Sequence, residues 1–376
     1  MNLSFWERET FFNKIDIAII GSGIVGLCAS IELKAKYPSK KIVIFERGFL
    51  PSGASTKNAG FACFGSLSEL LKDLDQFTEN EVFSLVEKRW KGLNKLKKIL
   101  NEKELGYESS GGYEIFSEVD EFQKCADYLA EINKKLNSII GTNVYEIAHS
   151  KIHEFGFKKV SKLIFNQFEG LVNTGSMIKN LISKAKSIGV EIYNGIEIKE
   201  INQAGEKVEI SISNNFYFTV NQVLITTNAF AKQLLPDLDL VPGRGQVLVT
   251  KPIENLKVKG AFHFDSGYYY FRNIENRILL GGGRNLDFKA EETTDFGTTG
   301  IVQEKLISIL KEVILPETSH QIDYNWSGIM AFGCQQEPII KAIDSRIFCA
   351  VKCQGMGVAL GALIGEKVAD LMEATL

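Results

Sequence analysis

The hydrophobic pattern is most regular near the start of the chain. Residues 15–20 (IDIAII) form a short, mostly β-branched apolar run, which is typical of a buried parallel strand. Residues 27–36 have the pattern of a helix, and residues 41–45 form a second apolar strand that ends at Glu46. A strand, a helix and a strand in this order predict a βαβ unit within an α/β fold.

Residues 21–26 (GSGIVG) join the first strand to the helix. In a dinucleotide-binding unit, Gly21 permits the tight turn, Gly23 lets the backbone approach a pyrophosphate, and Gly26 lets helix and strand pack closely. The helix N-terminus offers free N–H groups and a positive dipole end to the phosphates. Glu46 lies twenty residues after Gly26, where a carboxylate accepts hydrogen bonds from an adenosine ribose. Together these features predict dinucleotide binding.

Later segments alternate between helix and strand patterns. Residues 79–100 and 120–138 predict two amphipathic helices of a second lobe. Residues 207–220 alternate like strands, and residues 241–250, 268–272 and 277–283 are β-rich and predict a substrate sheet, while residues 299–313 predict a helix that closes that lobe.

The C-terminal region contains a second strand–glycine–helix junction. Residues 346–351 predict a strand, residues 353–357 (CQGMG) a glycine-rich turn, and residues 358–372 a helix. The N-terminus of this helix can face negative charge that develops on a cofactor. An ordinary helix cap in a doubly wound sheet is the alternative interpretation.

The composition is that of a soluble globular protein. The 376 residues allow two to three domains, and 45% hydrophobic and 24% charged residues are ordinary values for such chains. The net charge of −3 gives no reason to expect a nucleic-acid partner. Because the sequence has no secretory signal and no apolar run of membrane length, we expect no membrane span and a cytoplasmic location.

Cysteine and histidine usage argues against a disulfide framework and against a metal site. The six cysteines show no CxxC spacing, and we expect reduced thiols. His149 and His153 have the spacing of neighbours on a helix face, but no cysteine pair stands nearby. We therefore expect surface or packing histidines and no metal.

Residues 53–61 (GASTKNAGF) form a loop of small residues with several hydroxyls and an amide. Small residues let a backbone approach a flat or charged ligand, and hydroxyls donate to phosphate oxygens. As a pattern alone, the segment is equally consistent with an ordinary glycine-rich loop.

With these motifs in place, the chain resembles the D-amino-acid oxidase and glycine oxidase family of FAD-dependent oxidoreductases, and especially its γ-glutamylputrescine oxidoreductase-like members. The resemblance extends from about Ile15 to Leu371. Its landmarks, in family order, are GSGIVG with Glu46, GASTKNAGF at 53–61, GVEIYNGIEI at 189–198, ITTNAF at 225–230, VPGRGQV at 241–247, YYYFR at 268–272, LLGGG at 279–283, WSG at 326–328 and GMGVALG at 355–361. Each landmark alone is common, whereas their shared order is specific.

The resemblance implies FAD rather than NAD as the cofactor. Neither Cys334 nor Cys353 stands at the position used for covalent attachment in the sarcosine oxidase branch, so we expect non-covalent FAD. The positions that the resemblance assigns to FAD binding are Gly21, Gly23, Ile24, Val25, Gly26, Glu46, Arg47, Ser55, Thr56, Lys57, Asn58, Ala59, Ile198, Thr227, Gly355, Met356, Gly357 and Val358.

The implied fold class is α/β with an α+β second lobe. A Rossmann-type FAD-binding βαβ domain is interleaved with a β-rich substrate domain that carries long helices. We expect the FAD-binding domain at residues 14–80, 150–232 and 324–376, and the substrate domain at residues 81–149 and 233–323.

The substrate side departs from the family pattern. Family members that oxidise α-amino acids hold the carboxylate with an arginine where this chain has Met330, and some use another where it has Gly355. A bidentate guanidinium–carboxylate pair is a strong recognition element, so its loss puts a simple α-amino acid substrate in question. Arg244, Arg272 or Arg284 can supply the contact from another wall, or each serves as a surface or packing arginine.

Two tyrosines stand out on the substrate side. Tyr268 matches a substrate-facing tyrosine of the family, and Tyr270 shares its face at the two-residue period of a strand. An aromatic pair suits a cationic amine, although core packing explains the pattern equally well. We select Tyr268, Tyr270, Arg272 and Met330 as the candidate substrate-side residues.

These observations predict an FAD-dependent oxidoreductase that oxidises a C–N bond of an amine or amino-acid derivative by hydride transfer to the flavin, followed by hydrolysis of the imine. The expected partner is a small amine or amino-acid-like substrate. The alternatives are a 2-hydroxy acid dehydrogenase that passes electrons to a quinone, a flavin-binding subunit of a larger redox complex, and a nicotinamide-dependent dehydrogenase. The substrate, the electron acceptor and the oligomeric state are left open.

Overall fold

The predicted βαβ unit is present at the start of the fold. The computed structural model describes residues 3–213 and 216–373. Strand β1 (Ile15–Ile20) leads into helix α2 (Ile24–Lys36), which is followed by strand β2 (Ile42–Glu46). Helix α2 begins three residues earlier than the hydrophobic pattern predicted, because the Ser55 hydroxyl accepts the Ile24 N–H at 3.0 Å. A residue from a distant loop therefore caps the helix.

The first sheet has the strand order β17-β18-β11-β1-β2-β8, with β9 and β10 attached to β11. The five strands from β18 to β8 are parallel, and β17 is antiparallel at the edge. The further strands are β8 (Glu191–Asn194), β9 (Glu200–Ala204), β10 (Lys207–Ser213), β11 (Phe216–Ile225), β17 (Ile339–Ala342) and β18 (Ile347–Val351). The carboxyl ends of its central parallel strands therefore meet at one edge, where α/β folds bind ligands.

Alternate residues of the central strands enter two separate cores. Ile17 and Ile19 face one core together with helices α2, α8 (Thr174–Ser187) and α10 (Gly357–Glu373). Ala18 and Ile20 face the other core, which contains phenylalanines of β11. The sheet is thus buried on both faces, which explains the continuous apolar runs in its sequence.

The second sheet has the order β16-β12-β15-β14-β13-β4-β6-β5 and is mostly antiparallel. Its strands are β4 (Gly112–Phe116), β5 (Tyr145–Ile147), β6 (Lys162–Asn166), β12 (Val241–Thr250), β13 (Ala261–Phe264), β14 (Tyr269–Ile274), β15 (Arg277–Gly282) and β16 (Ile322–Phe332). Strands β3 (Phe61–Ala62) and β7 (Gly170–Leu171) form a separate small pair. One face of the large sheet packs on helix α9 (Gly300–Ile309) and its continuation to Ile314.

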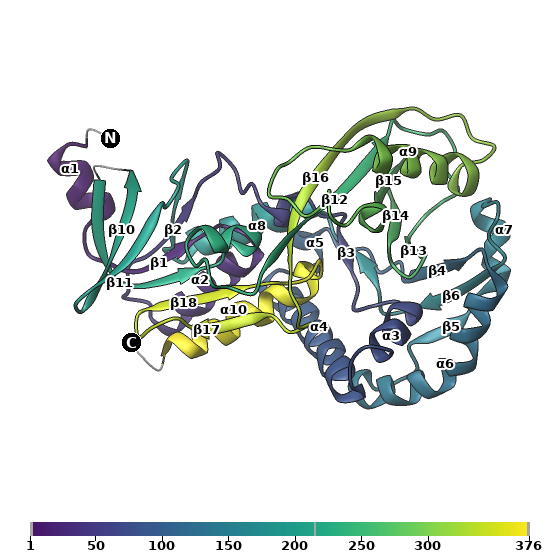
Figure 1. Cartoon of the computed structure of the whole chain (residues 1–376), viewed down its shortest axis with the longest axis horizontal. Coiled ribbons are helices and arrows are strands. Elements are labelled where there is room, and N and C mark those ends of the chain that lie inside the picture. The colour runs from purple at the N-terminus through teal and green to yellow at the C-terminus, as the bar shows by residue number, and fades with distance from the viewer. Residues whose placement is uncertain (1–2, 214–215, 374–376) are drawn as a thin grey trace.

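The remaining helices lie at several places around the two sheets: α1 lies beside β10, whereas α6 and α7 lie on the outer side of the second sheet (Figure 1). They are α1 (Phe5–Glu7), α3 (Leu67–Leu74), α4 (Glu79–Ile99), α5 (Glu102–Leu105), α6 (Val119–Ile140) and α7 (Ile152–Phe155). Helix α4 packs closely on α10, since a Cβ at Gly92 would lie 2.0 Å from the Ala359 carbonyl oxygen. Within the two described ranges, none of the helices has both the length and the apolarity to cross a membrane.

Two strands belong to a different sheet from the one that the expected domain ranges imply. Strand β6 lies within 150–232, and most of β16 lies within 324–376, yet both pair in the second sheet. Strand β16 runs antiparallel to β12 over almost its full length, and β6 lies between β4 and β5. The local pattern predicts a strand but not its partner, because pairing depends on residues far away in the sequence.

Gly26 allows the first strand and the first helix to meet. A Cβ at this position would lie 2.1 Å from the Gly21 carbonyl oxygen and 2.7 Å from Thr226 Oγ1. We expect Gly26→Ala to lower the free energy of unfolding by about 2 kcal/mol or more, because the backbone must shift to admit the methyl group. Chemical denaturation measures this change.

Gly175→Ala is the matched control, since Gly175 lies in the first turn of α8 and its nearest neighbour is Asn173 Oδ1 at an ordinary 3.4 Å. This variant should be as stable as the parent or slightly more stable, because alanine favours a helix. Equal stability of the two variants would contradict the close packing at Gly26.

Candidate active site

A cavity of about 580 Å³ lies between the two sheets. One wall of the cavity consists of the carboxyl ends of β1, β2, β11 and β18 and the loops that follow them. Its other wall is made by β12, β13, β14 and β16 of the second sheet. Helices α3 and α4 line the cavity as well.

The turn after β1 has the geometry that the glycine motif predicts. Gly21 has a φ of +103°, which favours glycine. A Cβ at Gly23 would lie 3.0 Å from Ser55 Oγ, so this side of the turn has no room for a larger residue. The N-terminus of α2 lines the cavity through Ile24 and Val25. The backbone can therefore approach a ligand closely at this point.

Glu46 is buried and held in place by four hydrogen bonds. The N–H and hydroxyl of Ser22 donate to its Oε2 at 3.1 and 2.9 Å. The Gly48 N–H and the Ser52 hydroxyl donate to its Oε1 at 2.9 and 3.1 Å. The next residue, Arg47, stacks over the Phe230 ring at 3.7 Å. A carboxylate and an aromatic–guanidinium stack thus border the same end of the cavity.

Most of the positions expected to bind FAD line the cavity. They are Gly21, Gly23, Ile24, Val25, Glu46, Arg47, Ser55, Lys57, Asn58, Ala59, Ile198, Thr227, Gly355, Met356, Gly357 and Val358. Two do not line it. Gly26 packs under the turn, and the Thr56 hydroxyl donates to the Pro51 carbonyl at 2.7 Å.

Met330 and Gly355 adjoin each other on the cavity wall. A Cβ at Gly355 would lie 3.5 Å from Met330 Sδ, and both residues line the cavity wall. By the family resemblance, these are the two positions at which members that oxidise α-amino acids have an arginine. Helix α10 begins two residues after Gly355, so its first-turn N–H groups border the same space.

Tyr268 and Tyr270 both line the cavity, but in different ways. Tyr270 lies on β14, and its ring packs edge-on against Phe61 at 5.6 Å between ring centres. Tyr268 precedes the strand, and its hydroxyl accepts a hydrogen bond from Lys72 Nζ at 2.6 Å.

Arg272 does not line the cavity, although it is among the candidate substrate-side residues. Its guanidinium is buried and donates to the carbonyl oxygens of Gly60 at 3.1 Å and Val172 at 2.9 Å. Burial lowers its pKa to about 10. This arginine holds the loop at 53–61 against β7, so its role is structural.

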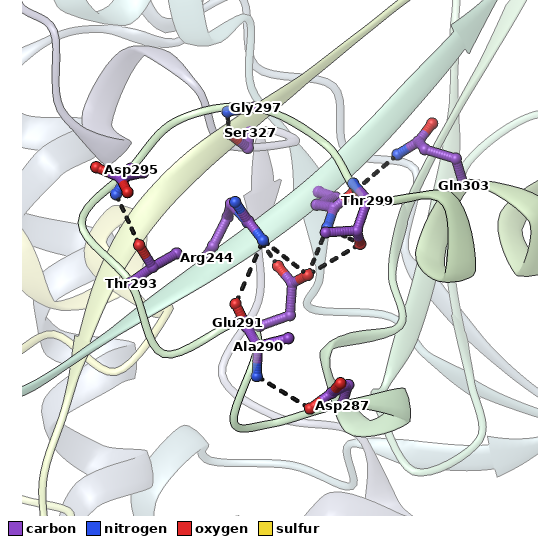
Figure 2. A network of polar contacts seen from close by, with 11 residues as sticks. Arg244, Asp287, Ala290, Glu291, Thr293, Asp295, Gly297, Thr299, Gln303 and Ser327 are labelled. Carbon is purple, nitrogen blue, oxygen red and sulfur yellow. Dashed lines mark hydrogen bonds and ion pairs between the residues drawn. The ribbon is translucent and has the colours of Figure 1, made fainter.

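Arg244 is also engaged elsewhere, as Figure 2 shows. It forms a two-pronged ion pair with the buried Glu291, with Nε–Oε2 at 2.8 Å and Nη2–Oε1 at 3.1 Å. Gln246 and Thr299 donate to the same carboxylate at 2.8 and 3.0 Å. Burial would raise the pKa of Glu291, but these donors lower it. The network pins the long segment between β15 and α9.

Arg284 is the arginine among these three that lines the cavity. Its guanidinium lies over the Phe332 ring at 3.9 Å and near the Phe288 ring at 4.8 Å. Phe332 follows Met330 by two residues on β16. In the described part of the chain, no carboxylate lies within ion-pairing distance of Arg284. Burial lowers its pKa, which still leaves the group charged.

The family model described as FAD dependent oxidoreductase matches residues 16–371. The chain belongs to this family. It is 21% identical over 368 residues to the probable oxidoreductase OrdL of Haemophilus influenzae, covering 94% of this chain and 82% of that protein. It is 22% identical over 378 residues to the glycine oxidase of Geobacillus kaustophilus, covering 96% and 93%. A glycine oxidase structure from Bacillus cereus has the same fold, with a TM-score of 0.77 at 18% identity and 96% of each chain covered.

The family predicted from the sequence is therefore confirmed, and so are its fold class and its cofactor. The oxidoreductase has a site that fits FAD. The glycine turn and the α2 N-terminus provide a cradle for a pyrophosphate, and Glu46 borders it. Among the described residues, the cavity-lining Thr227 has a buried hydroxyl without a hydrogen-bond partner. A ligand that supplies an acceptor or donor there satisfies it.

Sequence analysis missed several charged residues of the oxidoreductase cavity. Glu69, Lys72 and Asp73 lie on α3, a helix that we did not predict, and Arg89 lies on α4. A signal for α3 was present, since Ser66 and Glu69 form a capping box. His263 on β13 also lines the cavity, and a histidine within the strand AFHF was its only sign.

His263 belongs to a buried acidic network next to the cavity. Its Nε2 lies 2.7 Å from the Glu169 carboxylate, and neither side chain is exposed. Burial would lower the pKa of His263, but Glu169 raises it to about 9. On the neighbouring strand, burial raises the pKa of Glu114 to about 7 despite hydrogen bonds from Ser68.

His149 and His153 do not form a metal site. His149 lies in a 3-10 turn at His149–Lys151, and its Nδ1 accepts the Leu163 N–H at 3.1 Å. His153 lies on the short helix α7. Within residues 3–213 and 216–373, no group of three or more potential ligand side chains is placed to hold a metal ion.

The His263–Glu169 pair predicts a pH-dependent stability. Because the pKa of His263 is raised in the folded state, its contribution is fully present below about pH 6.5 and is lost as the pH rises through about 9. We expect the free energy of unfolding to fall by on the order of 3 kcal/mol over this range. Denaturation by urea at a series of pH values measures it.

The His263→Gln variant isolates the effect, because glutamine keeps a hydrogen-bond donor but does not titrate. Its stability should be lower at pH 6.5 and should vary much less between pH 6.5 and 9.5. A variant with the same pH slope as the parent would show that another group is responsible.

Proposed function

We propose that this oxidoreductase oxidises the C–N bond of a carboxylate-bearing amine, and that the resulting imine is hydrolysed by water. The observation that supports the proposal most is the single cavity that joins the dinucleotide-binding edge of the first sheet to the wall of the second sheet. That wall offers two tyrosines, a methionine and one arginine without an ion pair. The names of the relatives, which include glycine oxidases, agree with an amine substrate.

The residues of the glycine turn and the α2 N-terminus would hold FAD, which would supply the acceptor for a hydride from the substrate carbon next to nitrogen, while the protein supplies binding, orientation and electrostatics. The first-turn N–H groups of α10, at Gly357 and Val358, border the cavity and favour negative charge there. Tyr270 and Met330 provide the flat and apolar surface against which the substrate is oriented. Cys353 lines the cavity, and burial raises the pKa of its thiol to about 12, which agrees with non-covalent FAD.

Arg284 is the proposed carboxylate-binding residue. Of the three arginines that the sequence left as candidates, Arg244 pairs with Glu291 and Arg272 binds backbone carbonyls. Arg284 stacks on Phe332, beside the Met330 position at which we looked for the family's arginine. A guanidinium held by aromatic rings keeps its donors available for a planar carboxylate.

The charge of His263 makes this histidine unsuited to act as the base that a 2-hydroxy acid needs. An alcohol must lose its O–H proton when its carbon gives up a hydride, so the site needs a base. His263 lines the cavity, but Glu169 raises its pKa to about 9, and it is therefore protonated at neutral pH. An amine binds as a free base through its own lone pair and does not need this acceptor.

The anaerobic visible spectrum of the purified protein tests the proposal. We expect the flavin band of the holoenzyme to bleach with a pool of carboxylate-bearing amines, such as N-methyl and D-amino acids. A pool of 2-hydroxy acids should leave the band unchanged. Ammonia or a released amine should appear in proportion to the flavin reduced, because imine hydrolysis releases it.

Bleaching by the hydroxy acids alone would overturn the proposal in favour of a hydroxy acid dehydrogenase. A yellow protein that dithionite reduces but no amine pool reduces, and that copurifies with a second polypeptide, would instead indicate a flavin-binding subunit. A colourless protein that takes up no FAD would contradict both.

Arg284→Met tests the carboxylate contact. With an amine that bleaches the flavin, we expect KM to rise roughly 10- to 100-fold, because a charge-assisted hydrogen bond contributes about 1.5–3 kcal/mol. The reduction rate at saturation should change much less. Arg277→Met is the matched control. Arg277 is the first residue of β15, the strand that Arg284 follows, but it pairs with Asp323 at 2.5 Å and does not line the cavity. An equal KM in the two variants would remove Arg284 from the site.

A further inference from the structure

The end of the cavity formed by α3 and α4 contains two positively charged side chains. Lys72 on α3 and Arg89 on α4 both line it, together with Tyr268, Asp73 and Gln336. Lys72 Nζ donates to the Tyr268 hydroxyl at 2.6 Å and lies 4.1 Å from the centre of its ring. Arg89 Nη1 donates to the Phe64 carbonyl at 3.1 Å.

The two cations lack carboxylate partners. In the described part of the chain, no carboxylate oxygen lies within 4.0 Å of the charged nitrogens of Lys72 or Arg89. Lys88 and Lys95, on the same helix α4, do not line the cavity and are paired. Lys88 pairs with Glu337 at 2.5 Å, and Lys95 pairs with Glu32 at 2.9 Å and with Glu366 at 2.6 Å. Of these four basic residues, the two that line the cavity are the two without a carboxylate partner.

Two polar atoms at this end of the cavity have no hydrogen-bond partner among the described residues. They are Nε of Arg89 and Oε1 of Gln336, and both are buried. A buried guanidinium N–H without an acceptor costs free energy, so a bound ligand that supplies an acceptor there is favoured. Both residues line the cavity, which a ligand can enter.

Among the described residues, the nearby carboxylates Glu69 and Asp73 form no ion pair with Lys72 or Arg89. Glu69 accepts the Ser66 N–H at 2.8 Å in the capping box of α3. Asp73 lies within electrostatic reach of both Lys72 and Arg89 but within 4.0 Å of neither cation's charged nitrogens, and burial raises its pKa. The site therefore suits an anion better than a second amine.

We propose that Lys72 and Arg89 form a second anion subsite, which binds a distal acidic group of the substrate while Arg284 binds the carboxylate near the reacting carbon. The substrate class is then an amine with two acidic groups. This inference rests on the proposed function, because it assigns the second acid to the amine substrate. The phenol of Tyr268 lies beside the distal subsite, since Lys72 donates to its hydroxyl.

Binding of dicarboxylates to the holoenzyme tests the subsite without requiring turnover. The probes are succinate, glutarate and adipate, each compared with its monoamide, which has nearly the same shape but one charge fewer. Their binding is followed by the change that they cause in the absorption of bound FAD. We expect at least one diacid to bind about tenfold or more tightly than its monoamide.

Lys72→Met and Arg89→Met should each reduce this preference to within about twofold, and Arg89→Lys should restore part of it. Lys91→Met is the matched control, because Lys91 lies on α4 but is exposed and pairs with Glu87. It should retain the full preference. The conservative lysine variant also shows whether Arg89→Met fails only because the protein is misfolded.

The subsite is overturned if all three diacids bind no better than their monoamides, or if the preference survives in both methionine variants. This failure is distinct from failure of the proposed function. If amines bleach the flavin but no diacid is preferred, only the subsite is wrong. If a diacid is preferred but no amine ever reduces the flavin, the anion subsite stands and the assignment to an amine substrate falls.

Discussion

The structure depends on a backbone contact at the end of strand β1. Helix α2 passes so close to the turn that a single methyl group at Gly26 would strike the Gly21 carbonyl oxygen. This approach sets the direction of α2, and its N-terminus therefore points at the edge where the parallel strands end. Thr226 closes the contact from β11 by donating to Gly21. The cradle for FAD follows from packing and needs no charged side chain.

The opposite wall shows how surroundings decide what an arginine does. Arg272 is enclosed by backbone carbonyls, so its donors hold the loop that follows β2 in place. Arg244 meets a buried carboxylate and fastens the segment before α9. Within the described ranges, the guanidinium of Arg284 stacks on two aromatic rings and has no ion pair, and the rings offer no acceptor in the guanidinium plane. Two of the three arginines therefore stabilise loops, and the third is a candidate substrate-binding residue.

The cavity combines charged groups from distant parts of the chain. Lys72 and Arg89 come from helices of the first hundred residues, while His263 and Arg284 come from the second sheet. At the second sheet, the buried His263 and Glu169 neutralise each other's charge in an ion pair. Among the described residues, Lys72 and Arg89 have no carboxylate within ion-pairing distance, so their charges remain available to a ligand. We therefore assign the paired charges to stability and the unpaired charges of the cavity to substrate recognition.

The sequence by itself determined the βαβ unit, because that unit depends on local spacing along a strand, a turn and a helix. Its resemblance to the family implied the cofactor and sixteen of the positions that line the cavity. The sequence did not determine that β6 and β16 join the second sheet, nor which arginine reaches the cavity. Strand pairing and side-chain burial are decided by neighbours that are distant in sequence. Helix α3 and its Lys72 became functional candidates only when tertiary packing placed them beside Tyr268.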